Sequence, residues 1–193
     1  MTASQPSPTT SIDGHESSFL TPQRIRILAI AGIVVLLLAV TTWFLMTAGK
    51  RKEAFASRAL ESARSVAETG DLGTAVQQFQ QVATTYGGTD AGYEAHLGIA
   101  QARLVAGQAE LAMSSLEDFL RTNPPERFRG PANGLLATAM ENTGKYAEAA
   151  ATYRKASDME AVAYLKATLL LDAGRAALLA GDSTGAIAAY QEV

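Results

Sequence analysis

A sequence cassette that opens with a glycine occurs four times along this chain, at a constant spacing of 37 residues. In each copy an alanine follows the glycine after five residues, and a larger apolar residue follows it after nine. The glycines are Gly70, Gly107, Gly144 and Gly181; the alanines are Ala75, Ala112, Ala149 and Ala186; the larger residues are Phe79, Leu116, Tyr153 and Tyr190. A fixed period of about 20 to 50 residues is the signature of stacked supersecondary units. The period therefore predicts an array in which each unit packs against its neighbours.

Each unit is predicted to be a helix pair joined by a tight turn. Residues 53–193 carry apolar residues at helical spacing and lack the alternation typical of strands. The glycine suits the left-handed position just past a helix, and a second helix is expected to start about four residues after it. Small residues seven positions before each glycine should let the paired helices approach closely; they are Ala63, Ala100, Ala137 and Gly174. The predicted fold class is an all-α solenoid.

An uncharged apolar stretch of 22 residues runs from Ile27 to Ala48. At about 1.5 Å per residue it would extend about 33 Å as a helix, which matches the hydrocarbon core of a bilayer. A buried core helix or a cleaved signal peptide fits less well, because both have shorter apolar runs. We therefore expect one transmembrane helix, with the lipid bilayer as a partner.

The predicted organisation is a polar tail at 1–23, the membrane segment with its basic flanks at 24–52, and the repeat domain at 53–193. Basic and aromatic residues near the ends of the span are expected at the membrane interface. They are Arg24, Arg26, Trp43, Lys50, Arg51 and Lys52. Two of these positive charges precede the span and three follow it. Because positive flanks favour the cytoplasmic side, the count favours a cytoplasmic repeat domain by one charge.

The composition excludes some classes of function. The formal net charge is −3, and no cluster of Lys and Arg marks a nucleic-acid surface. Cysteine is absent from the sequence, which rules out disulfides and thiolate metal ligands. With 193 residues, the chain is long enough for one modest domain and an anchor.

A search for catalytic or binding motifs finds little. His96 falls on a predicted helix at a position that packs between repeats, and no partner for a metal site or a general base lies near it in sequence. The acidic pair Glu117 and Asp118 is expected on a solvated helix face. Neither a dinucleotide-binding glycine motif nor a phosphate-binding loop is present. We therefore expect no catalytic residue, metal, cofactor or small-molecule substrate, and interpret the chain as non-enzymatic.

Three places could bind a partner protein. The segment from Pro124 to Pro131 is expected to be a loop that projects Arg127, Phe128 and Arg129 as a docking site, or else a rigid spacer with the phenylalanine packed inside. The first helices of the pairs should form a concave face whose surface mixes charged, polar and apolar side chains. The residues expected on it are Arg64, Glu94, Gln101, Leu104, Thr138, Glu141, Leu171 and Arg175. The third place is the outer face of the fourth cassette, at Tyr190.

The cassette resembles the tetratricopeptide repeat over about residues 56–193. The second unit is the best match, and its matching residues are Ala100, Gly107, Ala112, Leu116, Phe119 and Pro124. Two departures are the 37-residue period, three longer than the usual one, and the loss of the large aromatic residue early in each first helix. The resemblance implies an α-solenoid that binds other proteins.

With its single N-terminal anchor, the chain looks like the bacterial ancillary-translocon type of tetratricopeptide protein. That resemblance implies a single-pass protein of the bacterial inner membrane with a periplasmic repeat domain, against the charge count. The expected function is a membrane-anchored scaffold that binds proteins as a subunit of, or accessory to, a multi-subunit membrane complex. The alternative is a translocon-associated periplasmic chaperone for secreted clients, and a membrane-bound enzyme is a remote third reading.

Overall fold

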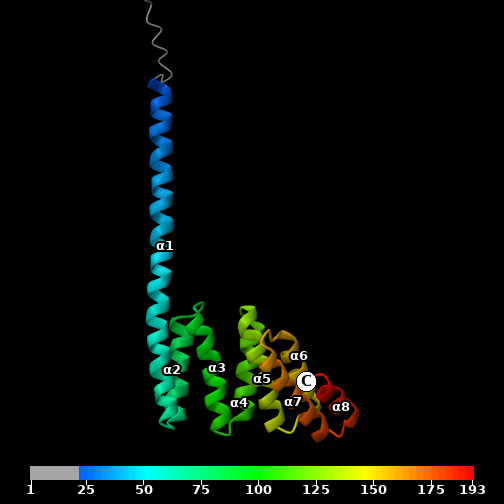
Figure 1. The fold of residues 1–193 in the computed structure, drawn as a ribbon. Helices are drawn as coiled ribbons and strands as arrows, with labels where there is room; N and C mark the ends of the chain where they lie inside the picture. The colour runs from blue at the N-terminus through cyan, green and yellow to red at the C-terminus, as the bar shows by residue number, and fades with distance from the viewer. Residues whose placement is uncertain (1–21) are drawn as a thin grey trace, which may run out of the picture. The chain divides into compact units, whose positions relative to one another are not determined.

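The computed structural model describes residues 22–193, and within them the side chains of 22–25, 27, 29, 45–48 and 50 are not described. All of the regular elements in this range are α-helices, as the sequence predicted (Figure 1). They are α1 (Pro22–Glu68), α2 (Leu72–Thr85), α3 (Asp90–Val105), α4 (Ala109–Arg121), α5 (Glu126–Asn142), α6 (Tyr146–Met159), α7 (Ala163–Leu179) and α8 (Ser183–Gln191). The tail predicted for residues 1–23 lies almost wholly outside the described residues.

The chain divides into two compact units, Met1–Thr47 and Ala48–Val193, and helix α1 contributes to both. In the first unit, the described side chains of α1 from Ile30 to Phe44 are exposed. Across the described residues, no helix meets the length and hydropathy needed to span a bilayer. The expected span from Ile27 to Ala48 includes positions whose side chains are not described, and the transmembrane helix stays a prediction.

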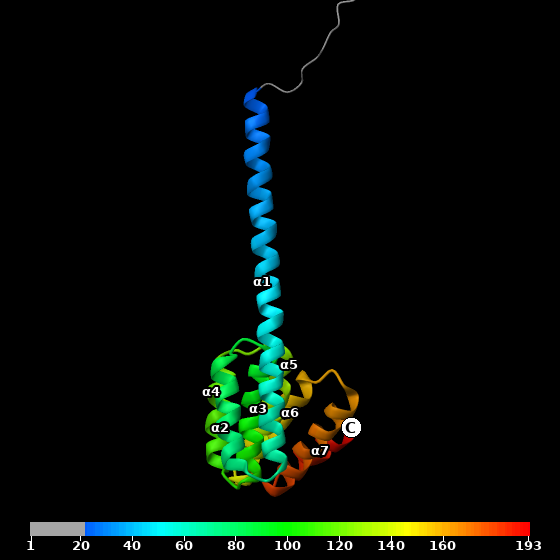
Figure 2. The ribbon, with the colours of Figure 1, turned by 90° about the vertical axis from the view of Figure 1, so that its left-hand side faces the viewer.

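The second unit is a stack of helix pairs, arranged in chain order in Figure 1, and Figure 2 shows the stack from the end that carries α2. The last part of α1 pairs with α2, and the following pairs are α3 with α4, α5 with α6, and α7 with α8. We refer to α1, α3, α5 and α7 as the first helices and to α2, α4, α6 and α8 as the second helices. Each second helix packs against the first helix of the next pair, as α2 does on α3, α4 on α5 and α6 on α7. This is the solenoid predicted from the 37-residue period.

The four cassette glycines form the turns within the pairs. Gly70, Gly107, Gly144 and Gly181 all have positive φ angles, between 73° and 86°. This is the left-handed conformation that side chains disfavour. After Gly107, the backbone amide of Gln108 donates to the carbonyl of Arg103 at 2.8 Å, which closes the helix end in the manner of a Schellman motif.

The second helices begin two residues after each glycine, rather than about four residues after it as predicted. The residue directly after the glycine is the N-cap. In the first and last turns it is an aspartate, and Asp71 and Asp182 accept hydrogen bonds from the backbone amides of Thr74 and Gly185. These caps satisfy amides that a helix start leaves without partners. Helices α4 and α6 start at the equivalent position without a side-chain cap bond, so the turn itself and not the cap sets where the helix begins.

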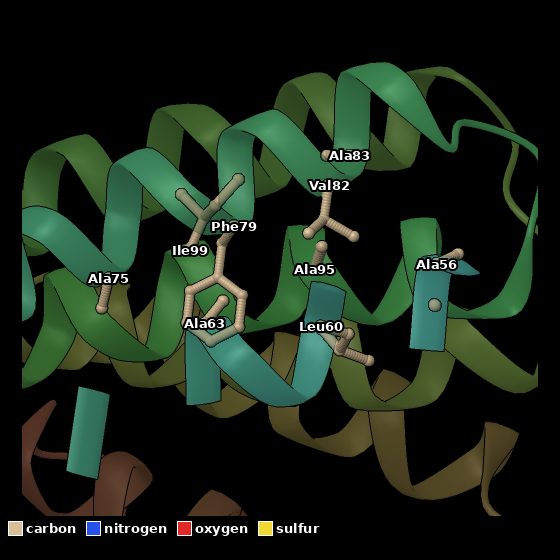
Figure 3. Packing of buried hydrophobic residues seen from close by; sticks show 10 residues of the cluster. Ala56, Leu60, Ala63, Ala75, Phe79, Val82, Ala83, Ala95 and Ile99 are labelled. Carbon is tan, nitrogen blue, oxygen red and sulfur yellow. The ribbon is translucent and has the colours of Figure 1, made fainter. Parts of the chain in front are cut away.

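The core consists of small residues at the helix crossings and larger residues between the pairs. Ala63 and Ala75 are fully buried where α1 meets α2, and Phe79 packs between them and α3 (Figure 3). The corresponding small residues of the later pairs are buried as well; they are Ala100, Ala112, Ala137, Ala149, Gly174 and Ala186. The repeat register predicted from the sequence is therefore the register of the core.

Candidate partner-binding surface

Four residues of the first helices lie at equivalent positions, one residue after each small crossing residue. They are Arg64, Gln101, Thr138 and Arg175, spaced by 37. Arg64, Gln101 and Arg175 have exposed side chains, and Thr138 is half-buried. The sequence placed all four on the concave face, and the structure shows two different environments among them, one around Arg64 and Gln101 and one around Arg175.

Arg64 and Gln101 lie on the rim of a groove between α1 and α3, with a volume of about 390 Å³. Its apolar lining comes from Phe79 and from small or aliphatic side chains, and Glu68 adds a carboxylate. The remaining lining residues are Ala67, Leu72, Gly98, Ala102 and Val105. An apolar floor with a few polar groups at the rim is the usual composition of a binding pocket.

The groove depends on Gly98, in the middle of α3. A Cβ atom at this position would lie 2.8 Å from the nearest carbon of the Phe79 ring. Because Phe79 is held in the core, only a glycine lets α3 pack directly on the flat ring. Gly98 was not among the predicted site residues. The available signal was that its equivalents 37 residues away, Glu61 and Leu135, are not glycines.

Arg64 forms ion pairs with Glu94 on α3 and, at 3.8 Å, with Glu61 on its own helix. The side chains of Arg64 and Glu94 are 49% and 40% exposed. Ion pairs this exposed contribute about 0 to 1 kcal/mol, because water and salt screen them. The guanidinium can therefore exchange Glu94 for a carboxylate of a partner at little cost.

Arg175 belongs to a more enclosed network on α5, α6 and α7. Its guanidinium pairs with Glu141 and donates to Asp172 at 2.8 Å. The hydrogen bond to Asp172 raises the pKa of Arg175. The Tyr153 hydroxyl donates to Glu141 at 3.2 Å, and burial raises the pKa of this tyrosine to about 12, so that it keeps its proton at neutral pH. This network joins neighbouring repeats. Arg175 is as exposed as Arg64, but its partner Glu141 is only 11% exposed, whereas Glu94 is 40% exposed.

Comparison with known families agrees with this architecture. A model of the tetratricopeptide repeat-like domain matches residues 23–193. The chain belongs to the tetratricopeptide repeat-like family. No curated protein matches the chain. Domains of this family are scaffolds for protein–protein interaction and are typically non-enzymatic.

In this tetratricopeptide repeat-like chain, residues 124–131 do not form the predicted loop, while a docking role for Arg127 and Arg129 stays a prediction. Helix α5 begins at Glu126, with Pro125 as its N-cap and Pro131 inside the helix. Pro125 is compatible with a helix start, because the first amides lack partners in any case, whereas Pro131 lies beyond the first turn and removes one intrahelical hydrogen bond. The segment thus contributes the first turns of a helix.

The three residues assigned to that loop have separate roles in the stack. Phe128 is only 6% exposed and packs 5.2 Å from the ring of Tyr93, as the rigid-spacer alternative predicted. Arg127 pairs with Asp90 of α3, and the Nε of Arg129 donates to the carbonyl of Pro124 at 2.7 Å. Phe128 therefore cannot serve as an exposed aromatic anchor.

Tyr190 lies on α8 and is 40% exposed, whereas its equivalent Tyr153 is buried. Its ring contacts α7 at Gly174, where a Cβ atom would lie 2.4 Å away. The assignment of Tyr190 to partner binding is untested.

The predicted membrane-interface residues are only partly visible. Arg26, Trp43 and Arg51 are exposed, while the side chains of Arg24 and Lys50 lie outside the described residues. Lys52 is exposed and belongs to the repeat unit, where its Nζ donates to the carbonyl of Gly87 at 3.2 Å. Their interface role stays a prediction.

His96 is half-buried and its ring stacks on Phe119, with ring centroids 4.7 Å apart. Burial lowers its pKa from the ordinary value of 6.5. The unfolded chain therefore takes up a proton near pH 6.5, while the folded chain resists it until a lower pH. The free energy of unfolding is thus expected to fall as the pH drops below about 6.5.

Denaturant unfolding between pH 5.5 and 7.5 checks this expectation. The variant His96→Asn replaces the histidine with asparagine, the residue type found at the equivalent position of the third pair, Asn133. It should flatten the pH dependence in this window, because the carboxylates titrate at lower pH. An equally steep dependence in the variant would assign the effect to another group.

Proposed function

We propose that this protein is a membrane-anchored scaffold whose repeat unit binds a partner protein in the groove between α1 and α3. The observation that carries the proposal is the groove itself, with Phe79 beneath it and Arg64 and Gln101 at its rim. Its polar groups come from flexible side chains, which adapt to a polypeptide more readily than to one small molecule. The partner we infer is a segment with an apolar side chain for the floor and a carboxylate for Arg64.

The membrane part of the proposal rests on the sequence. The 22 uncharged residues from Ile27 to Ala48 have the length of a bilayer span. We infer a single-pass protein of a bacterial inner membrane that acts as a subunit of, or accessory to, a multi-subunit membrane complex. The periplasmic location of the repeats is supported by family resemblance, and it opposes the flanking charges. Cleavage of the repeats by protease added to spheroplasts would support it, and full protection would contradict it.

Site-specific photo-crosslinking tests the groove. A photo-reactive residue in place of Gln101 should cross-link the partner in intact membranes. The same residue in place of Gln77, an exposed glutamine of α2 that is not part of the groove, is the matched control. Equal products from both positions would contradict binding in the groove.

The identity of the cross-linked protein distinguishes the two forms of the function. A stable partner that also copurifies in mild detergent at constant stoichiometry supports the scaffold. A varied set of secreted proteins at low yield supports the chaperone alternative. Substituting Arg64→Ala should weaken cross-linking from position 101 in either case, because it removes the cation at the rim.

A further inference from the structure

One edge of the repeat unit carries a row of contacts that joins α1, at Glu53, to the starts of α3 and α5. Glu53 on α1 accepts hydrogen bonds from the backbone amides of Asp90 and Ala91 at the start of α3, both at 3.1 Å. Asp90 in turn pairs with Arg127 at the start of α5. Glu53, Asp90 and Arg127 are each 37 residues apart, and the next member of this series is Tyr164 in the first turn of α7. The contacts of the row join α1, α3 and α5, and its 37-residue spacing places Tyr164 at the equivalent position of α7.

The row ends at an apolar tip, which we define as Met159, Val162, Tyr164 and Leu165 at the connection from α6 to α7. All four side chains are exposed, and Tyr164 is 75% exposed. Met159 and Arg127 line the same surface hollow, so the tip continues the edge beyond α5.

The start of α7 lacks a side-chain cap, as the start of α5 at Pro125 also does, and unlike α3 and α5 it has no acidic residue in its first turn. At α3 the N-cap is Thr89, whose hydroxyl accepts a hydrogen bond from the amide of Gly92. At α7 the N-cap is Val162, which has no polar side chain, and the first turn has no acidic residue. A valine here stabilises the helix less than a threonine or serine would. The exposed side chains of the apolar tip gain no burial within the fold, so their apolar area is available to another apolar surface.

The same edge is where the chain enters the repeat unit. Lys52 contacts the turn before α3 through Gly87, and Glu53 begins the row. Glu53 follows Ala48, the last residue of the uncharged stretch, by five residues of helix, or about 8 Å at 1.5 Å per residue. The polar interface of a bilayer is about 5 to 8 Å thick on each side. If the stretch spans a membrane, the edge begins within reach of the headgroups.

We propose that the apolar tip inserts into the lipid interface and holds the repeat unit against the membrane by a second contact. This inference rests on the membrane anchor of the proposed function. Tyrosine prefers this depth, where its ring is apolar and its hydroxyl remains hydrated. The attraction comes from apolar burial, since Arg127 is already paired with Asp90. The expected surface is a phospholipid bilayer with or without anionic lipids.

Spin labels provide the test, because the chain has no cysteine of its own. The full-length protein is reconstituted in phosphatidylcholine vesicles with a nitroxide on one introduced cysteine, and its accessibility to oxygen and to a water-soluble nickel chelate is measured. Label positions are Tyr164→Cys in the tip, Gln108→Cys in a turn at the opposite edge, and Val35→Cys in the proposed span. The tip label should favour oxygen over nickel several-fold more than the label at position 108.

Each outcome has a distinct meaning. A water-exposed label at position 35 refutes the anchor and with it the tip. An inserted label at position 35 with equal nickel access at 164 and 108 refutes the tip alone. A tip label shielded from both reagents indicates a protein contact and also overturns the inference.

A second variant separates membrane contact from folding. Adding Val162→Ser to the labelled protein supplies an N-cap oxygen, so its melting temperature should stay equal or rise. The same change removes apolar area from the tip, so the oxygen preference of the label at 164 should fall. An unchanged oxygen preference would contradict insertion of Val162.

Discussion

Replacing Phe79 with alanine is expected to lower the free energy of unfolding by about 3–5 kcal/mol, since large-to-small changes of buried aromatic residues leave a cavity as well as losing transfer energy. The ring is 3% exposed and packs against α1 and α3 at once (Figure 3). Removing it should therefore weaken both the first pair and its interface with the second. Denaturant unfolding followed by circular dichroism measures the effect.

The matched control is Phe55→Ala on α1. Phe55 is 58% exposed, and its ring lies 6.0 Å from the guanidinium carbon of Arg58. Exposed substitutions away from caps and buried networks usually change stability by less than about 0.5 kcal/mol. If both variants lost equal stability, the core assignment of Phe79 would be wrong.

Gly98→Ala is the second substitution for which we expect a large effect. It should lower the free energy of unfolding, although a change from glycine to alanine inside a helix usually raises it. Alanine is favoured over glycine inside a helix by about 1 kcal/mol. At position 98, however, the added methyl would meet the Phe79 ring at 2.8 Å, and this ring is 3% exposed and packed in the core, so it cannot shift without disturbing its neighbours. Overpacking of this kind costs about 1–3 kcal/mol, so a net loss of stability is expected.

Gly174→Ala is the comparison that isolates this cause. Its methyl would also meet an aromatic ring, that of Tyr190 at 2.4 Å. That ring is 40% exposed on the last helix and can rotate away, so the helix propensity of alanine should offset the contact. Thermal or denaturant unfolding should show Gly98→Ala to be the less stable variant. The reverse order would mean that the ring contacts do not control these positions.

A double-mutant cycle tests the contact directly. Phe79→Leu removes the flat ring, and it should remove part of the penalty of Gly98→Ala. Additive effects of the two changes would show that residue 98 is sensitive for another reason. The same glycine shapes the groove in which we place the partner, so loss of cross-linking in Gly98→Ala would connect packing to binding.

The local pattern of the sequence was enough for the repeat. The 37-residue spacing predicted the turn glycines, the small residues at the helix crossings and the large residues between pairs, because each depends on contacts within one pair or with the next. Arg64 and Gln101 were also placed correctly on the first helices, since helical periodicity decides which face a residue occupies.

The segment around Phe128 shows where such reasoning failed. Pro124 and Pro125 are compatible with a loop and with a helix start, whereas Pro131 by itself argues against a helix at that point. Packing against Tyr93 and Phe119 favours the helix, because it buries the phenylalanine. No local pattern contains the information that α3 and α4 supply these neighbours.

By itself, then, the sequence determined the all-helical repeat, its period and the residues of its core. The tertiary structure alone decided which exposed residues meet. It opened the groove between α1 and α3 at Gly98, committed Arg175 to an inter-repeat network, and joined Glu53, Asp90 and Arg127 along one edge. The physical reason is that core positions repeat with the helix period, whereas grooves and ion pairs depend on the particular side chains that neighbouring helices bring together.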